Sequence, residues 1–168
     1  MGDKTYPLSH NRIRHIYEDK EQQLWIATDG SINRYDYATR QFIHYNIVDN
    51  TGTYNTNWTY YIFEDTAGQL WISTCLGGIF VVDKRKLMQS TSGQYIAEQN
   101  YSVHNGLSGM FINQIIPDNE GNVWVLLYNN KGIDKINPRT REVTKLFADE
   151  LTGEKSPNYL LCDEDGLL

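Results

Sequence analysis

The sequence predicts an all-β fold, a partial β-propeller of about three and a half four-stranded antiparallel blades. The first observation is the pattern Asp-x-x-Gly-x-Leu-Trp-Ile-x-Thr, which occurs in three variants and begins a fourth time. The second is the spacing, since Trp25, Trp71 and Trp124 stand 46 and 53 residues apart. The third is that the chain between them consists of short apolar runs separated by turns. A period of roughly 40–50 residues built from short strands is typical of propeller blades rather than of independent domains.

Each unit is expected to begin with an innermost strand and a tight hairpin. An aliphatic residue stands nine positions before each Trp, as Ile16, Ile62, Ile115 and, in the incomplete fourth copy, Leu160. The Asp of the pattern is expected to accept hydrogen bonds from amides of its own turn, while Gly takes a positive φ. Gln22 replaces that Gly in the first unit. We therefore interpret the following residues as structural: Asp19, Trp25, Asp65, Gly68, Trp71, Asp118, Gly121, Trp124, Asp163 and Gly166.

The strands after the Trp complete each predicted blade. A third strand is expected at 32–36, 79–83 and 133–137, and a fourth follows, because 36–42 and 137–143 align without a gap. In the middle unit this region is longer. It runs from Lys84 to Gln99 through a loop rich in Ser, Thr and Gly before Tyr95 and Ile96. The basic run that opens it, residues 84–86, is expected to be a solvated turn.

These patterns divide the chain into five segments. They are a lead-in at 1–10, a first blade at 11–46, a second blade with inserted loops at 47–104, a third blade at 105–150, and the first strand and turn of a truncated fourth blade at 151–168. Such units can stack, but they are too few to close a ring of the common sizes. Open blade edges and apolar blade faces are expected to favour self-association, and two copies could complete one ring.

Composition narrows the function classes. With 15 Lys and Arg against 21 Asp and Glu, the net charge of −6 argues against a nucleic-acid surface. No apolar stretch approaches the ~20 residues that span a bilayer, and the N-terminus lacks the apolar run of an export signal. The four His and two Cys residues show no metal-ligand spacing. We expect no metal, no cofactor and no nucleic-acid partner.

The repeat resembles a known family. The string Ile-x-x-Asp-x-x-Gly-x-Leu-Trp-Ile-x-Thr-x-x-Gly-Gly-Ile, with the lead-in His104-Asn-Gly-Leu-Ser108, is similar to the two-component regulator propeller repeat. The likeness covers residues 11–168. It implies the periplasmic region of a hybrid two-component sensor histidine kinase of Bacteroidetes, in which tandem propellers precede an immunoglobulin-like domain, a membrane helix, a kinase and a response regulator. Such sensors detect glycan-derived oligosaccharides, so the resemblance implies a non-catalytic segment, with membrane attachment only through the parent protein.

Loops that break the repeat are the candidate ligand-binding sites, because loops on a rigid scaffold carry function more often than the scaffold. Two aromatic and amide clusters suit sugar stacking and hydroxyl hydrogen bonding. The first consists of Tyr54, Asn57 and Trp58, and the second of Tyr128, Asn129 and Asn130. The alternative for both is structural, since Asn-rich turns are common and Trp58 can pack on an adjoining blade.

Two other functions stay open. A propeller lyase or glycosidase would need paired carboxylates, in hydrolases roughly 5–9.5 Å apart. The candidate pairs are Glu18 with Asp19, Glu64 with Asp65, and the acids at 163–165, but each includes the Asp of a predicted hairpin. We therefore expect no catalytic residue in this chain. The remaining alternative is an interaction module without a small ligand.

Overall fold

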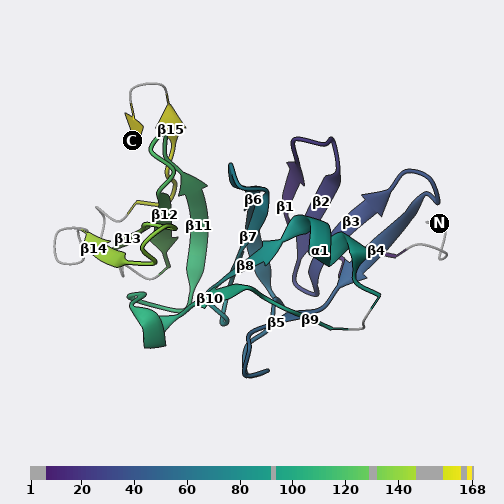
Figure 1. The fold of residues 1–168 in the computed structure, drawn as a ribbon, viewed down its shortest axis with the longest axis horizontal. Helices are drawn as coiled ribbons and strands as arrows, with labels where there is room; N and C mark the ends of the chain where they lie inside the picture. The colour runs from purple at the N-terminus through teal and green to yellow at the C-terminus, as the bar shows by residue number, and fades with distance from the viewer. Residues whose placement is uncertain (1–6, 92–93, 129–131, 147–156, 164–165, 168) are drawn as a thin grey trace.

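The computed structural model describes residues 7–91, 94–128, 132–146, 157–163 and 166–167. Three four-stranded antiparallel sheets stand side by side and are accompanied by two two-stranded sheets (Figure 1). The prediction of an all-β fold made of propeller blades is confirmed. The inner strand of the middle sheet lies next to the inner strands of both neighbouring sheets, so the three blades share one inner side.

The strand order within each blade follows the chain. The first sheet is β1 (Ile13–Glu18), β2 (Leu24–Thr28), β3 (Ser31–Asp36) and β4 (Gln41–Tyr45). The second is β6 (Thr59–Glu64), β7 (Gln69–Thr74), β8 (Ile79–Asp83) and β10 (Gln99–Tyr101). The third is β11 (Ile112–Pro117), β12 (Val123–Leu127), β13 (Ile133–Ile136) and β14 (Val143–Leu146). Near the end of the chain, β15 (Cys162–Asp163) pairs with β16 (Gly166–Leu167).

The hydrophobic cores lie between the blades. Trp25 is fully buried in a core that contains Ile62 and Ile72 of the second sheet. Trp71 occupies the equivalent place in a core with Ile115 and Val125 of the third sheet. Each blade therefore supplies half of a core that its neighbour completes, which explains why a single unit could not be stable alone.

The Asp-x-x-Gly hairpins have the expected turn chemistry and one additional contact. Asp65 Oδ1 accepts hydrogen bonds from the amides of Ala67 and Gln69 at 2.8 and 2.9 Å. Its second oxygen accepts one from Trp71 Nε1 at 2.9 Å. The same Trp-to-Asp bond, also 2.9 Å long, occurs in the first and third units. The Asp thus ties its turn to the Trp of the following strand. In the fourth copy, Asp163 and Gly166 are opposite each other in the β15–β16 pair.

A backbone strain distinguishes the first hairpin from the others. Gln22 has φ +61°, while Gly68 and Gly121 have φ +78° and +84° at the equivalent position. A residue with a side chain is destabilised by about 1 kcal/mol or more at such a φ angle. Replacing it with Gly removes this strain but also raises the entropy of the unfolded chain, which offsets part of the gain. We expect Gln22→Gly to raise the free energy of unfolding by about 0.5 kcal/mol, measured by urea denaturation.

The matched control is the opposite kind of substitution, from Gly to a residue with a side chain, in the third hairpin. No atom outside the neighbouring residues lies within 4 Å of a Cβ added at Gly121, so Gly121→Ala tests the φ angle alone. It should lower stability by about 1 kcal/mol. Equal effects of both substitutions in the same direction would contradict this account.

The region after β8 differs from the sequence-based expectation. Residues expected to form a loop begin with a short helix, α1 (Lys84–Gln89), whose first turn is capped by Asp83 accepting from the Lys86 amide at 3.1 Å. The next strand, β9 (Tyr95–Ile96), does not join the blade but pairs in parallel with β5 (Ile47–Val48). The fourth blade strand is β10 instead. Two insertions from different parts of the sequence thus form a small sheet of their own.

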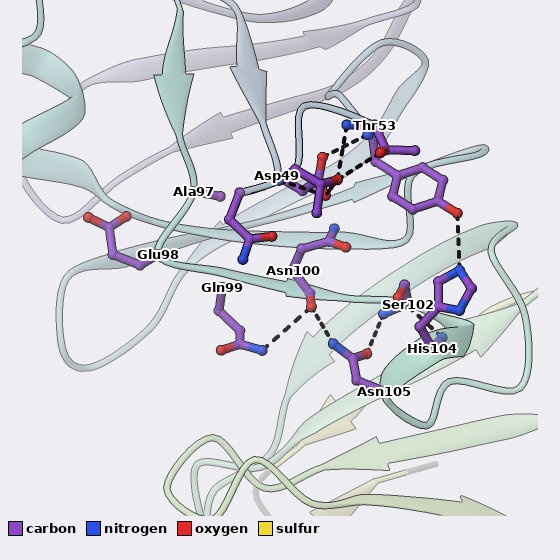
Figure 2. Close-up of a pocket in the computed structure, with 12 residues that line it drawn as sticks. Asp49, Thr53, Ala97, Glu98, Gln99, Asn100, Ser102, His104 and Asn105 are labelled. Carbon is purple, nitrogen blue, oxygen red and sulfur yellow. Dashed lines mark hydrogen bonds between the residues drawn. The ribbon is translucent and has the colours of Figure 1, made fainter.

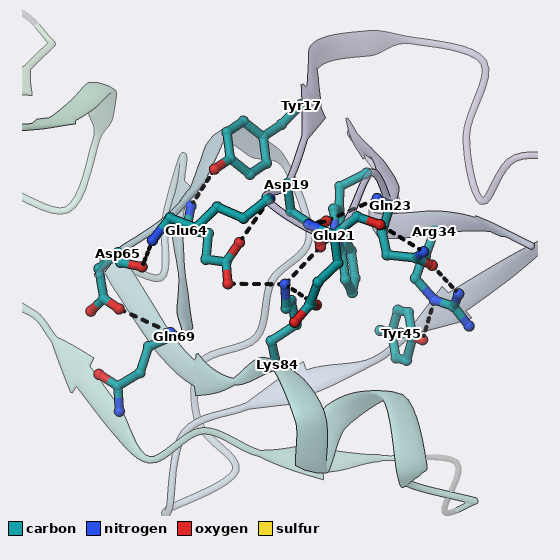
Figure 3. Close-up of polar contacts among 12 residues, drawn as sticks. Tyr17, Asp19, Glu21, Gln23, Arg34, Tyr45, Glu64, Asp65, Gln69 and Lys84 are labelled. Carbon is teal, nitrogen blue, oxygen red and sulfur yellow. Dashed lines mark hydrogen bonds and ion pairs between the residues drawn. The ribbon is translucent and has the colours of Figure 1, made fainter. Parts of the chain in front are cut away.

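The expectation of a solvated turn at 84–86 was wrong for Lys84. Only 1% of this residue is exposed, because its aliphatic stem enters the boundary between the first two blades. Its ammonium contacts Asp19 at 3.0 Å and Glu64 at 2.9 Å, which are both buried, and the more exposed Glu21 at 2.5 Å (Figure 3). Hydrogen bonds to these carboxylates outweigh burial and raise the pKa of Lys84. The hairpin of one blade is therefore held to the next by a buried cation.

Candidate functional site

Each blade carries a β-bulge at the second residue of its inner strand. The pairing register shifts between Ile13 and His15, between Thr59 and Tyr61, and between Ile112 and Gln114. The residues left out of the pairing are Arg14, Tyr60 and Asn113. A bulge bends its strand and turns one side chain away from the regular alternation, and bulges are frequent beside functional sites.

These three residues line one cavity of about 410 Å³, which we call the axial cavity. Its wall consists of Arg14, His15, Tyr60, Tyr61, Asn113, Gln114, Asn158 and Tyr159. Each of the four copies of the repeat contributes two residues to this wall. They are the two residues that precede the aliphatic residue of the predicted inner strand. The repeat thus brings the same two positions to one surface, with a different side chain in nearly every copy.

Side chains of the axial cavity also join successive copies. Gln114 brackets the backbone of Leu160, donating to its carbonyl at 2.9 Å and accepting from its amide at 2.8 Å. At the equivalent position of the first blade, His15 Nδ1 accepts from the Ile62 amide at 3.4 Å. Since Nδ1 is the acceptor, a proton carried by the neutral ring is on Nε2. The cavity wall is therefore built into the contacts that align the blades.

The axial cavity carries little net charge. The Arg14 guanidinium donates to both carboxylate oxygens of Asp29, at 2.7 and 3.3 Å, and its Cζ lies 4.6 Å from the centre of the Tyr60 ring. Hydrogen bonding to Arg14 lowers the pKa of Asp29, so this ion pair stays charged, and Arg12 contacts the same carboxylate at 3.3 Å. Burial lowers the pKa of His15, whose ring stacks on Tyr61 at 3.8 Å. The wall therefore offers aromatic rings and amides rather than unpaired charge.

The described residues among those proposed from the sequence line cavities other than the axial one. Tyr54, Asn57 and Trp58 line a cavity of about 330 Å³. Tyr128 lines another, of about 220 Å³, which shares Tyr60 with the axial cavity. Asn129 and Asn130 lie outside the described residues. The structure thus separates the two predicted clusters rather than merging them.

Trp58 has the most unusual backbone of this group. Its φ is +55°, an uncommon value for a bulky residue, and 48% of the residue is exposed. Its amide donates to the Asp29 carbonyl at 3.0 Å, and its own carbonyl accepts from the Cys75 amide at 2.9 Å. Two blades therefore hold the strained residue in place, with its indole at the surface. Strain of this kind is found preferentially at functional sites.

The axial wall was missed by sequence reasoning, although a sign of it was present. Our search concentrated on loops that interrupt the repeat, whereas the wall uses positions inside it. The sign is the variation at a constant offset from the Trp, where Arg14, Tyr60 and Asn113 occupy one position. Nothing in the sequence showed that this position is bulged.

Three further observations concern metal-binding groups, membrane-spanning helices and disulfides among the described residues. They contain no group of three or more His, Cys, Asp or Glu side chains arranged to hold a metal ion. No helix in the described part of the chain is long and apolar enough to cross a membrane. The two cysteines, Cys75 and Cys162, are not joined in a disulfide.

The fold and the repeated hairpins define the class of protein. The sequence profile of the two-component regulator propeller matches residues 7–30 and 106–129. These two segments thus match the two-component regulator propeller repeat, which agrees with the resemblance found in the sequence.

Solved structures give the particular likeness. The chain is 99% identical to the extracellular domain of BT4673 from B. thetaiotaomicron, described as a proposed one-component or hybrid two-component system. The match has a TM-score of 0.94 and covers 99% of this chain but only 23% of that one. The extracellular domain of BT3049 from the same organism is 21% identical over 92% of this chain and 19% of that one, with a TM-score of 0.66.

A more distant likeness concerns the fold alone. Virginiamycin B lyase from Staphylococcus aureus is 15% identical over 96% of this chain and 50% of its own, with a TM-score of 0.68. No match was found among curated proteins.

Proposed function

We propose that this chain is part of a non-catalytic, ligand-sensing propeller in the extracytoplasmic region of a hybrid two-component sensor histidine kinase, and that its axial cavity contacts a glycan-derived oligosaccharide. The 99% identity to an extracellular domain of that description supports the first part. Because the chain spans 23% of that domain, the signalling itself belongs to the longer protein. Membrane attachment is expected only through that longer protein, and we place this segment in the periplasm.

The observation that carries the ligand proposal is the convergence of two equivalent positions from four repeats on one cavity. Three of the eight side chains are tyrosines and three are amides, and Arg14 is ion-paired with Asp29. Aromatic faces and amide groups are the side chains that stack on sugar rings and bond their hydroxyls. A rigid wall with varied side chains fits recognition without chemistry.

The test is binding at this wall. The chain and its Tyr60→Ala and Tyr159→Ala variants are titrated by calorimetry with a panel of neutral and acidic oligosaccharides. We expect a panel member that binds the unaltered chain to bind each variant about tenfold more weakly. Tyr37→Ala, at an exposed tyrosine outside the cavity, is the matched control and should bind normally. Unchanged affinity in both wall variants would refute the axial cavity as the site.

The enzyme alternative finds little support in the geometry. The hairpin carboxylates Asp19, Asp65 and Asp118 are each occupied by turn amides and by a Trp indole. Within the described part of the axial wall the side chains include no carboxylate, and Asp29 behind Arg14 is ion-paired. The likeness to a lyase is one of fold only.

We also propose that the free face of the first blade is covered by another blade, which a second copy can supply when the chain is alone. Ile16 is 58% exposed, whereas its equivalents Ile62, Ile115 and Leu160 are 0%, 0% and 4% exposed. Burying one such side chain contributes about 1.5–3 kcal/mol, which favours association through this face.

Light scattering on a sizing column measures this association. We expect the chain to exceed the monomer mass and Ile16→Asp to return it to the monomer. Ile96→Asp is the control, because Ile96 is equally exposed, at 60%, but lies on the inserted strand β9. A folded monomer of the unaltered chain would exclude self-association.

A further inference from the structure

A further cavity lies on the rim of the second blade and shares no residue with the axial wall. We call it the rim cavity. It measures about 480 Å³, and its lining includes Asp49, Thr53 and Tyr54 on one side and Glu98, Gln99 and His104 on the other (Figure 2). The volume is within the range of small-molecule sites, roughly 300–1,000 Å³.

The rim cavity is built by insertions together with the last strand of the second blade. One wall comes from the insertion after β4 and the other from residues 97–105, which include β10. The two meet in the parallel β5–β9 pair, where the Tyr95 amide donates to the Asn46 carbonyl at 2.8 Å and the Ala97 amide to the Val48 carbonyl at 2.9 Å. Ile47 of β5 and Leu87 of α1 are fully buried in the same core as Trp25. The insertions therefore form a packed, pre-shaped floor.

The loop above the floor is held closed by Asp49. This carboxylate accepts from the amides of Tyr54 at 2.8 Å and Thr51 at 3.3 Å, and Gly52 turns the chain at φ +71°. These contacts fix Tyr54 at the edge of the cavity. Because hydrogen bonds inside the loop occupy both carboxylate oxygens, Asp49 keeps its negative charge but has little hydrogen-bonding capacity left for a ligand.

The opposite wall is equally ordered. Ser102 and Asn105 form a capping box around a short 3₁₀ turn, η1 (Val103–Asn105), and Asn105 Nδ2 donates to the Asn100 carbonyl at 2.6 Å. This turn places His104 Nε2 3.5 Å from the Tyr54 hydroxyl, so the two walls touch across one end of the cavity. Gln99 and Asn105 also line the cavity, and the side chains of both approach the Asn100 carbonyl (Figure 2).

The side chains of the rim cavity that remain available to hydrogen-bond a ligand are neutral. The second carboxylate, Glu98, accepts from the Tyr95 hydroxyl at 2.8 Å and the Asp83 amide at 2.9 Å, with Lys86 at 3.5 Å. Gln99 makes one long bond, to the Asn100 carbonyl at 3.5 Å. What faces the cavity is thus a set of amides and hydroxyls beside one aromatic ring, which suits a ligand with many hydroxyl groups and no charge.

We propose that the rim cavity is a second ligand site, separate from the axial cavity, that takes a neutral, hydroxyl-rich molecule of the size of a mono- or disaccharide. The inference rests on the rim geometry alone and does not need the axial cavity to bind anything.

The experiment maps binding residue by residue. The isotope-labelled chain is titrated into the tens of millimolar with lactose, maltose and cellobiose, and separately with a galacturonic acid dimer as the charged probe, while backbone amide shifts are followed by NMR. We expect saturable shifts at Thr53, Gln99 and His104 with at least one neutral probe. The charged probe should bind about tenfold more weakly or not at all.

Variants separate this site from the axial one. Tyr54→Ala and Gln99→Ala, on opposite walls, should each weaken the rim response about tenfold, whereas Tyr159→Ala and Tyr37→Ala should leave it unchanged. Absence of saturable rim shifts with all neutral probes overturns the proposal, as does a rim response that neither rim variant alters. Shifts confined to axial residues would overturn it while leaving the proposed function intact. Saturable shifts at rim residues without shifts at axial residues would support the rim cavity as a site and count against the axial cavity.

Discussion

Replacing Lys84 with Met is expected to lower the free energy of unfolding by about 3–5 kcal/mol, the cost of removing one partner from a buried ion pair. The substitution preserves most of the aliphatic stem but removes the ammonium that contacts Asp19 and Glu64. Both carboxylates are nearly inaccessible to water, so each would be left as an uncompensated charge between two blades. Urea denaturation followed by tryptophan fluorescence measures the loss.

The same helix provides the control. Lys86 contacts Asp83 and Glu98, but its side chain is 66% exposed. Surface pairs of this kind contribute about 0–1 kcal/mol, so Lys86→Met should change stability by no more than that. If the two substitutions had similar effects, the buried cation would not be what joins the first and second blades.

The ion cluster also predicts a pH dependence. Burial opposes ionisation of Asp19, but bonds from the Trp25 indole, the Gln23 amide and Lys84 more than offset it and lower the pKa of Asp19 below its ordinary 3.8. The contribution of Asp19 is thus present above about pH 4 and is lost as the pH falls further. Since the pKa of Lys84 is raised, its contribution is complete below pH 10.5 and is lost at higher pH. Lys84→Met should flatten both flanks of the stability profile.

Truncating Trp71 to Ala is expected to cost about 3–5 kcal/mol, as for a large aromatic side chain removed from a core. Trp71 is 1% exposed and stacks against Tyr101 at 5.6 Å and Phe63 at 6.0 Å. Its indole nitrogen also holds Asp65 of the preceding hairpin. The substitution therefore opens a cavity between two blades and loosens a turn, and the midpoint of urea unfolding reports both.

Two further variants separate these contributions. Trp71→Phe retains much of the packing but removes the indole N–H, and leaving the Asp65 oxygen without that donor should cost about 1–3 kcal/mol. Trp124→Ala changes the equivalent residue of the third blade, which is only partly buried and lies under the Lys135 ammonium at 5.0 Å. We expect it to cost less than Trp71→Ala. Equal losses at both Trp positions would contradict the dependence on burial.

The blade hairpins could be predicted because their chemistry is local. An Asp that binds the amides two and four residues later, a positive φ three residues later and a Trp six residues later all lie within one short segment. The indole bond to Asp65 was not predicted, although its six-residue spacing is constant, because sequence spacing alone does not show which side chains turn toward each other. The inner strands at Ile16, Ile62 and Ile115 were predicted correctly for the same local reason. The strand predicted at Leu160 was not found there, because β15 begins two residues later.

The axial wall and Lys84 could not be predicted, because both depend on contacts between segments far apart in the chain. A bulge at Tyr60 follows from the pairing of β6 with β7 and not from the residue itself. The basic run 84–86 gives no sign that its first member enters a boundary formed by Asp19 and Glu64, 65 and 20 residues away. Exposure was the reasonable expectation for all three residues of the run, and it was correct for Arg85 and Lys86.

The fold class, the repeat and the hairpin turns could be predicted from the sequence, since these need only periodic apolar residues and turn chemistry that is complete within one blade. The stacking of the blades in three dimensions was needed to show which side chains meet in the axial and rim cavities, and that the insertions pair with each other rather than extend their blades. The physical reason is that a blade buries its faces against its neighbours. The chemistry of the surfaces between blades is therefore set by which residues the stacking brings together.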